Sequence, residues 1–351
     1  MVSTRKLDHI NISLKRDVQS KIKNGFEDIT FVHRALPEID RDEIDTSCEF
    51  FGKKIGAPIF IAAMTGGHEK AKKINENLAL AAAELNIPMG VGSQRAAIEE
   101  EGLAPTYSIV REAAPDIFLI GNVGAVQFAE NYGIEEARKA VEMIDANALA
   151  VHLNPLQEAI MPEGDVDFKG ALDGLKKLKD LSVPVIAKET GAGIAMEEAK
   201  LLEAAGAKGI DVGGLGGTSF SAVEYYRRKG FDETFWDWGI PTAVSTIECL
   251  AGTSLNIMST GGIRNGLEVA KAVSLGAVSC GIAHPLLAEA LKGKDEVRNA
   301  LIKIIDELKT AMFLTGARTV EELKGVDLVI TGTTNDWLSN RGIDTKKFAR
   351  R

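Results

Sequence analysis

The chain has 351 residues, of which 45% are hydrophobic and 26% are charged, and this composition is typical of a globular protein with a full hydrophobic core. Its net charge of −9 argues against a general surface for nucleic acid or acidic lipid, and no apolar run approaches the roughly 18 residues of a membrane span. Cys48, Cys249 and Cys280 form neither a disulfide framework nor a zinc motif, and no signal-peptide pattern is present, so we expect a cytoplasmic protein.

Residues 1–57 are predicted to form an extension in front of the main fold. They contain a basic start, an amphipathic segment and the stretch CEFFGKKIGAP, which predicts a hairpin. We expect this hairpin to close the N-terminal mouth of a barrel.

Short apolar runs rich in Ile, Val and Ala then recur about every 30 residues, with helical patterns between them, which indicates βαβ units. Eight such runs begin at Pro58, Ile87, Ile117, Ala148, Val183, Lys208, Leu255 and Val278. Eight units in about 240 residues favour a closed (β/α)8 TIM barrel over an open doubly wound sheet.

The predicted α/β fold is a single domain, residues 1–351, with the barrel at 58–293. A C-terminal extension at 294–351 begins with a long helical pattern that Gly316 should end. The longest connection, 213–253, is long enough to form a lid.

Polar residues gather where the strands are expected to end, which is the active-site face of a TIM barrel. The fourth run, ALAVHLN, leads into His152, Asn154, Gln157 and Glu158 within seven residues. Lys188 ends the fifth run, where a lone inward ammonium is costly unless it meets an anion. That anion is either part of a ligand or a neighbouring Asp or Glu.

Glycine-rich turns follow three of the strands. STGGIRNG, after strand seven, precedes a helix expected to start near Asn265, and GIAHP follows strand eight. Exposed N–H groups at such turns bind phosphate, so a phosphorylated ligand is favoured over tight turns with no binding role. VGGLGGTSF, after strand six, is equally consistent with a second phosphate contact and with a flexible hinge.

The motifs IFIAAMTGG, GVGSQR, GNVG, VHLNPLQE, AKETGAGI, DVGGLGGTSF and STGGIRNG, with RKLDH near the N-terminus, together resemble the type 2 isopentenyl diphosphate isomerases. These are flavin-dependent enzymes with a (β/α)8 barrel. The resemblance extends over all eight strand ends. It implies the interconversion of isopentenyl and dimethylallyl diphosphate in isoprenoid biosynthesis, with reduced FMN as acid and base.

The resemblance also implies a role for each residue of the site. Gln157, His152 and Lys188 would be catalytic, and Glu158 would hold Mg²⁺. FMN would contact Met64, Thr65, Ser93, Asn122, Lys188, Thr218, Gly261, Gly262, Arg264 and Ala283. The substrate would contact Arg5, Lys6, Ser93, Arg95, His152, Asn154 and Gln157. NADPH would reduce the flavin without being consumed stoichiometrically, and the protein would be a homotetramer or homo-octamer.

Other interpretations of these residues compete with the isomerase. Without the resemblance, Arg5 and Lys6 are a solvated terminus, His152 is a hydrogen-bonded structural residue and Glu158 caps a helix. An FMN-dependent oxidoreductase of the hydroxy-acid oxidase type needs a His base near the ends of strands six and seven, and GGLGGTSFSAVEYYRRKG contains none. That stretch also lacks the Cys that a nucleotide dehydrogenase needs. A noncatalytic flavin-binding scaffold would leave Arg95 unexplained.

Overall fold

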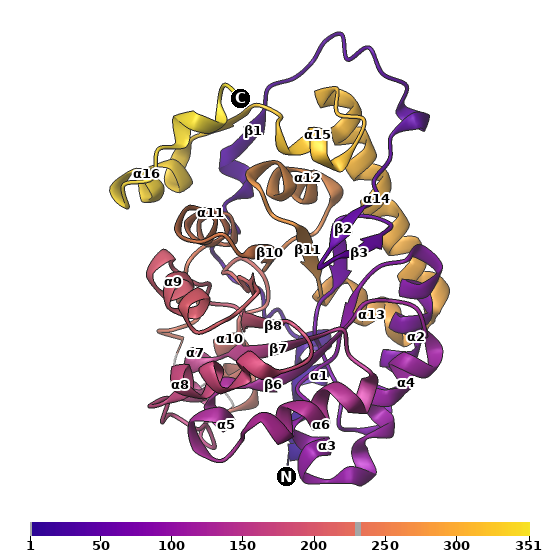
Figure 1. Ribbon diagram of the computed structural model, residues 1–351, viewed down its shortest axis with the longest axis vertical. Helices are drawn as coiled ribbons and strands as arrows, with labels where there is room; N and C mark the ends of the chain where they lie inside the picture. Colours follow the sequence, from indigo (N-terminus) through magenta and orange to yellow (C-terminus); the bar gives the residue numbers. More distant parts are fainter. Residues whose placement is uncertain (1, 229–232) are drawn as a thin grey trace.

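The computed structural model describes the backbone of residues 2–228 and 233–351, and the side chains within these ranges from residue 8 onward. Parallel strands close into a barrel in the order β10-β11-β4-β5-β6-β7-β8-β9, of which β6, β7, β8, β10 and β11 are labelled in Figure 1. The strands are β4 (Ile59–Ile61), β5 (Met89–Gly90), β6 (Leu119–Gly124), β7 (Ala148–Leu153), β8 (Val185–Glu189), β9 (Gly209–Asp211), β10 (Asn256–Thr260) and β11 (Ser279–Ile282). Each lies within one of the eight predicted runs, so the predicted TIM barrel is confirmed.

Helices surround the barrel because each strand is followed by an amphipathic segment. In α2, for example, Ala71, Ile74, Leu78 and Ala82 recur at helical spacing and are buried. The barrel helices are α2 (Glu69–Leu85), α3 (Arg95–Glu99), α4 (Pro105–Ala113), α5 (Ala125–Glu130), α6 (Ile134–Ile144), α7 (Pro155–Ile160), α8 (Ala171–Lys176), α9 (Met196–Ala204), α10 (Phe220–Arg227), α11 (Thr242–Gly252), α12 (Gly266–Leu275) and α13 (His284–Lys292). No helix in the described part of the chain is long and apolar enough to cross a bilayer.

The predicted hairpin is present as β2 (Cys48–Phe50) and β3 (Lys53–Ile55), which pair antiparallel. Its Phe50 is fully buried and packs edge-to-face on Phe118, with ring centroids 5.0 Å apart. Phe60 and Met258, from inside the barrel, belong to the same apolar cluster. The hairpin therefore fills the N-terminal mouth of the barrel, as expected.

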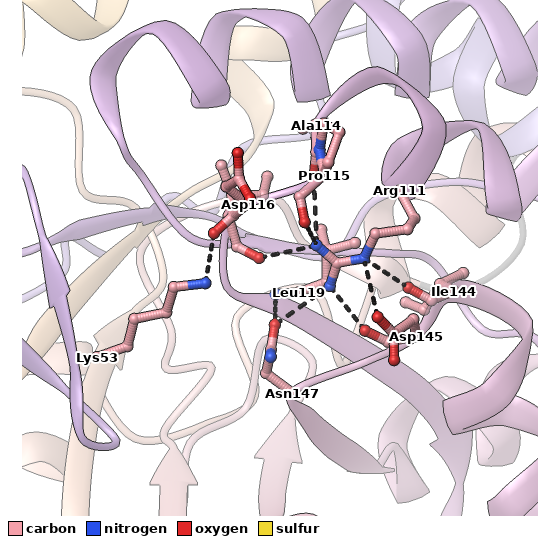
Figure 2. Close-up of polar contacts among 10 residues, drawn as sticks. Lys53, Arg111, Ala114, Pro115, Asp116, Leu119, Ile144, Asp145 and Asn147 are labelled. Carbon is pink, nitrogen blue, oxygen red and sulfur yellow. Dashed lines mark hydrogen bonds and ion pairs between the residues drawn. The ribbon is translucent and has the colours of Figure 1, made fainter.

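The guanidinium of Arg111 binds several backbone carbonyl groups in the connections that lead into β6 and β7. Arg111, near the end of α4, donates to the carbonyls of Pro115 and Asp145 at 2.7 Å and of Ile117 at 3.1 Å (Figure 2). Helix ends leave such carbonyls without intrahelical partners, and Arg111 satisfies them at the ends of two helices at once. Lys53 of the hairpin adds a contact to the neighbouring carbonyl of Asp116.

The two extensions meet each other. In the N-terminal extension, α1 (Val2–Lys15) precedes β1 (Ile29–Phe31), and both are labelled in Figure 1. Strand β1 pairs antiparallel with β12 (Leu328–Ile330) of the C-terminal extension. This pairing was not predicted. The predicted long helix is α14 (Lys294–Thr315), and Gly316 ends it with φ 75°, as expected. The remaining helices are α15 (Val320–Lys324) and α16 (Gly332–Asn340).

The division of the chain at residues 57 and 293 stays a prediction. Three-residue and four-residue 3-10 helices complete the described structure. They are η1 (Phe26–Asp28), η2 (Arg41–Glu43), η3 (Glu101–Leu103), η4 (Lys177–Asp180) and η5 (Thr345–Phe348).

Candidate active site

A cavity of about 310 Å³ opens where the barrel strands end. It brings together every predicted site residue whose side chain is described. These are Met64, Thr65, Ser93, Arg95, Asn122, His152, Asn154, Gln157, Glu158, Lys188, Thr218, Gly261, Gly262, Arg264 and Ala283. Arg5 and Lys6 lie on α1, and their side chains are outside the described residues. Their location relative to the cavity therefore stays a prediction.

Helices α1 and α10 form one side of this cavity. His9 and Phe220 both line it, and His9 Nε2 lies 2.9 Å from the Glu224 carboxylate on α10. Glu224 also receives a bond from Arg227 Nε at 2.7 Å, and Arg227 reaches Glu163 in the segment after α7. The long connection after β9 thus contains α10, which these contacts fix to α1 and to the segment after α7. The sequence analysis missed Glu224 because nothing near it in sequence marks its partners.

Lys188 is paired with a carboxylate that the sequence analysis did not single out. Strand register places His152, Lys188 and Asp211 side by side on β7, β8 and β9. Lys188 Nζ lies 3.2 Å from Asp211 Oδ2, and the two side chains are only 11% and 3% exposed. The ion pair considered as the alternative for Lys188 therefore exists, while Lys188 also lines the cavity. The signal for Asp211 was a charged residue at the end of an apolar run.

His152 is oriented by Asn122 on the adjacent strand. The Asn122 amide donates from Nδ2 to the Val91 carbonyl at 3.0 Å, so its Oδ1 faces His152 Nδ1 at 2.9 Å and accepts from it. The Nδ1 atom therefore carries a proton, and the ring is held in one orientation. Asn122 supports His152 as well as lining the cavity.

The start of α7, directly after β7, is organised around Asn154, which is 3% exposed. Its Nδ2 donates to Glu158 Oε1 at 2.7 Å and to Gln157 Oε1 at 3.3 Å, while Glu158 Oε2 accepts from the Asp165 N–H at 2.8 Å. Glu158, within α7, therefore joins the residues on both sides of this helix and does not act as a helix cap. Asn154 Oδ1 is buried without a hydrogen-bond partner in the described structure, so an acceptor is available for a ligand.

The glycine turns after β9 and β10 interlock backbone to backbone. A Cβ on Gly262, whose φ is 72°, would lie 2.1 Å from the Gly216 carbonyl oxygen, and one on Gly217 would lie 2.6 Å from Gly262 N. Asn24 of the N-terminal extension clamps this contact, since its Nδ2 donates to the Gly262 carbonyl at 3.0 Å. The turn after β9 is therefore held in place and is not a free hinge. The sequence analysis missed Asn24 because its partner, Gly262, is distant in sequence.

The donors at this end of the cavity fit the phosphate of FMN. Within 2–228 and 233–351, neither Gly262 N–H nor Ile263 N–H donates to a protein acceptor, and both residues line the cavity. Unpaired N–H groups just before a helix are suited to an anion. Thr260 Oγ1, also at the cavity, is buried without a partner among the described residues. Lys188 supplies a fixed positive charge farther along the cavity wall.

The residues fit Mg²⁺ only with help from a ligand. No group of three or more His, Cys, Asp or Glu side chains suited to a metal occurs among the described residues. Mg²⁺ commonly uses one or two carboxylates and takes phosphate oxygens and water for the rest. A magnesium site here would use Glu158 as its protein ligand and would take its other oxygens from a bound diphosphate and water.

Comparison with known proteins places the chain in a family. The FMN-dependent dehydrogenase family matches residues 12–107 and 136–329. The isopentenyl-diphosphate delta-isomerase of Thermococcus kodakarensis is 55% identical, covering 99% of this chain and 96% of the relative. That of Methanothermobacter thermautotrophicus is 51% identical over the whole of both chains.

Solved structures agree on the fold. A structure of mandelate oxidase with 3,3-difluoro-2-hydroxy-3-phenylpropionic acid has a TM-score of 0.64 and 19% identity, covering 95% of this chain and all of that one. At this identity the likeness shows the fold alone. The isomerases are far more similar in sequence, and the chain therefore belongs to the FMN-dependent dehydrogenase family and, within it, to the type 2 isopentenyl-diphosphate delta-isomerases.

Proposed function

We propose that this protein interconverts isopentenyl diphosphate and dimethylallyl diphosphate in isoprenoid biosynthesis, with FMN and Mg²⁺ as cofactors. The observation that carries the proposal is one cavity that combines phosphate-binding turns, a buried ammonium and the polar residues of β7 and α7. The reaction adds a proton at one carbon and removes another nearby, so no electrons are transferred overall. Bound in its reduced form, FMN would supply the acid and base for these proton transfers.

The chain's own residues hold the cofactor at two points. The Gly262 and Ile263 N–H groups bind the phosphate, together with Arg264 and Thr218 at the same end of the cavity. Lys188 provides a preorganised charge that favours an electron-rich ring, and such a charge is effective because it needs no reorganisation during the reaction. Met64, Thr65, Ser93 and Ala283 complete the binding surface.

The diphosphate of the substrate is assigned to Arg95, His152 and Asn154, with Arg5 and Lys6 added from α1. Glu158 holds Mg²⁺, whose other ligands are phosphate oxygens and water. Gln157 does not ionise at neutral pH, so its role is to orient the reacting carbons or to relay a proton. His152 keeps one orientation because Asn122 accepts its Nδ1 proton.

Three further parts of the proposal rest on the family resemblance alone. NADPH reduces the flavin and is not consumed with each turnover. The protein acts in the cytoplasm, and it assembles as a homotetramer or homo-octamer.

The test is an anaerobic incubation of the protein with FMN, Mg²⁺ and isopentenyl diphosphate, with and without a reductant. Proton NMR should detect dimethylallyl diphosphate only when the flavin is reduced, and a substoichiometric amount of reductant should suffice. Consumption of one reductant for each product molecule would instead support an oxidoreductase of the hydroxy-acid oxidase type. No product with reduced flavin would refute the proposal.

A further inference from the structure

Asp211 lies next to Lys188 and does not line the ligand cavity. Both are at matching positions of neighbouring parallel strands, so their side chains point to the same, inner face of the barrel. Lys188 lines the cavity and Asp211 does not. The carboxylate is buried and in contact with the ammonium, so its influence on a ligand passes chiefly through the charge and position of Lys188.

Only one of the two Asp211 carboxylate oxygens has a partner in the Lys188–Asp211 pair. Asp211 Oδ2 faces Lys188 Nζ at 3.2 Å, whereas Asp211 Oδ1 is buried with no hydrogen-bond partner among the described residues. Its register partner on β10 is Met258, which supplies no strong donor. Burying a carboxylate with one poorly satisfied oxygen is costly, so a purely structural role would be served better by an amide or an apolar residue.

Lys188 has a second acceptor that would hold it without Asp211. Its Nζ donates to the Glu189 backbone carbonyl at 2.8 Å. A substitution of Asp211 by a neutral residue of equal size therefore leaves one anchor for the ammonium and removes the counter-charge. The two contributions, position and charge, are thus separable by experiment.

We propose that Asp211 is a positioning residue that fixes the Lys188 ammonium at the cofactor cavity and partly neutralises it, which sets how strongly reduced FMN is favoured over oxidised FMN. The proposal rests on FMN as the cofactor of this cavity. As a pair, Lys188 and Asp211 carry no net charge. Without the carboxylate, the cavity wall carries a full positive charge, which stabilises the electron-rich reduced ring more strongly.

The experiment measures the midpoint potential of FMN bound to the wild type, Asp211→Asn and Lys188→Met. A nearby charge shifts a buried equilibrium by about tenfold or more. A tenfold gain in the preference for reduced FMN corresponds to about 30 mV for a two-electron couple. We therefore expect the potential to rise by at least about 30 mV in Asp211→Asn and to fall by a similar amount in Lys188→Met.

A double variant guards against failure of Asp211→Asn to fold. Lys188→Met with Asp211→Asn removes both charges, and neutral replacements of buried ion pairs are usually tolerated. Its potential should lie near that of the wild type and above that of Lys188→Met alone. An unchanged potential in Asp211→Asn, a fall in that variant, or a double variant no higher than Lys188→Met would overturn the proposal. Failure of the wild type to bind FMN would instead overturn the proposed cofactor.

Discussion

Replacement of Gly262 by alanine tests whether the interlocked turns are the cofactor cradle. The new Cβ would lie 2.1 Å from the Gly216 carbonyl oxygen, more than 1 Å inside the 3.4 Å at which ordinary contacts begin. The contact is to backbone, so it cannot be relieved by a side-chain rotation. One turn must move, and the N–H groups of Gly262 and Ile263 move with it.

The magnitude follows from two separate costs. Holding an alanine at φ 72° costs about 1–2 kcal/mol of stability whatever its surroundings. A displaced cradle loses at least one hydrogen bond to a charged phosphate, worth about 1.5–3 kcal/mol, which weakens FMN binding by about tenfold to a hundredfold. Both costs appear in Gly262→Ala, whereas only the first appears where the space around a positive-φ glycine is open.

Gly52 of the β2–β3 hairpin provides that control, because its φ is 80° and no atom lies within 4 Å of the place that a new Cβ would occupy. Flavin fluorescence titration gives the dissociation constant for FMN, and urea unfolding of the apoprotein gives the stability of each variant. Gly52→Ala should lose stability and bind FMN like the wild type. The reasoning is refuted if Gly262→Ala binds FMN as tightly as Gly52→Ala and the wild type do.

Three further predictions concern two polar residues of α7, the N-terminus and a buried acid. Gln157→Asn should lower turnover with little change in magnesium dependence. Glu158→Gln should raise the Mg²⁺ concentration needed for activity, and its activity should recover partly at high Mg²⁺. Loss of activity in both variants without any response to magnesium would contradict these separate roles. Removal of residues 1–6 should raise the Michaelis constant for isopentenyl diphosphate and preserve FMN binding. An unchanged Michaelis constant would mean that Arg5 belongs to a solvated terminus and does not bind the substrate. Burial raises the pKa of Glu189 from 4.5 to about 7, although three backbone N–H groups donate to it. The folded state therefore binds this proton more tightly than the unfolded state. The contribution of Glu189 to the free energy of unfolding is complete below pH 4.5 and should be lost as the pH rises to about 7. Urea unfolding at a series of pH values should show this decline in the wild type and a weaker dependence on pH in Glu189→Gln. Equal dependence of the free energy of unfolding on pH in the two proteins would refute this prediction.

The barrel was predictable because its signals are local. Each strand is a short apolar run closed by polar or glycine residues, and Gly316 marks a helix end by its own conformational freedom. The lining of the cavity followed for the same reason: the strand ends of a closed parallel barrel meet at one face, so finding them in sequence brings His152 and Lys188 together.

The missed features depend on partners that the sequence does not bring together. Asp211 gains its importance only from the strand register that places it beside Lys188. Asn24 reads as an ordinary loop residue until folding sets it against Gly262, and the three-residue strands β1 and β12 carry too little pattern to reveal their pairing. Such contacts arise from tertiary packing, which local propensity does not determine.

The pairing of β1 with β12 imposes an order on assembly during synthesis. At about 5–20 residues per second, the ribosome needs roughly 15–60 s after releasing β1 to produce its partner strand. Throughout that interval the segment containing Asn24 has no sheet to anchor its far end, even when the barrel strands near it are already complete. The β1–β12 pairing is therefore completed only when the last part of the chain emerges. Because the lining of the cavity extends to Leu287, a nascent chain should acquire its flavin late, after nearly all of the barrel has been made.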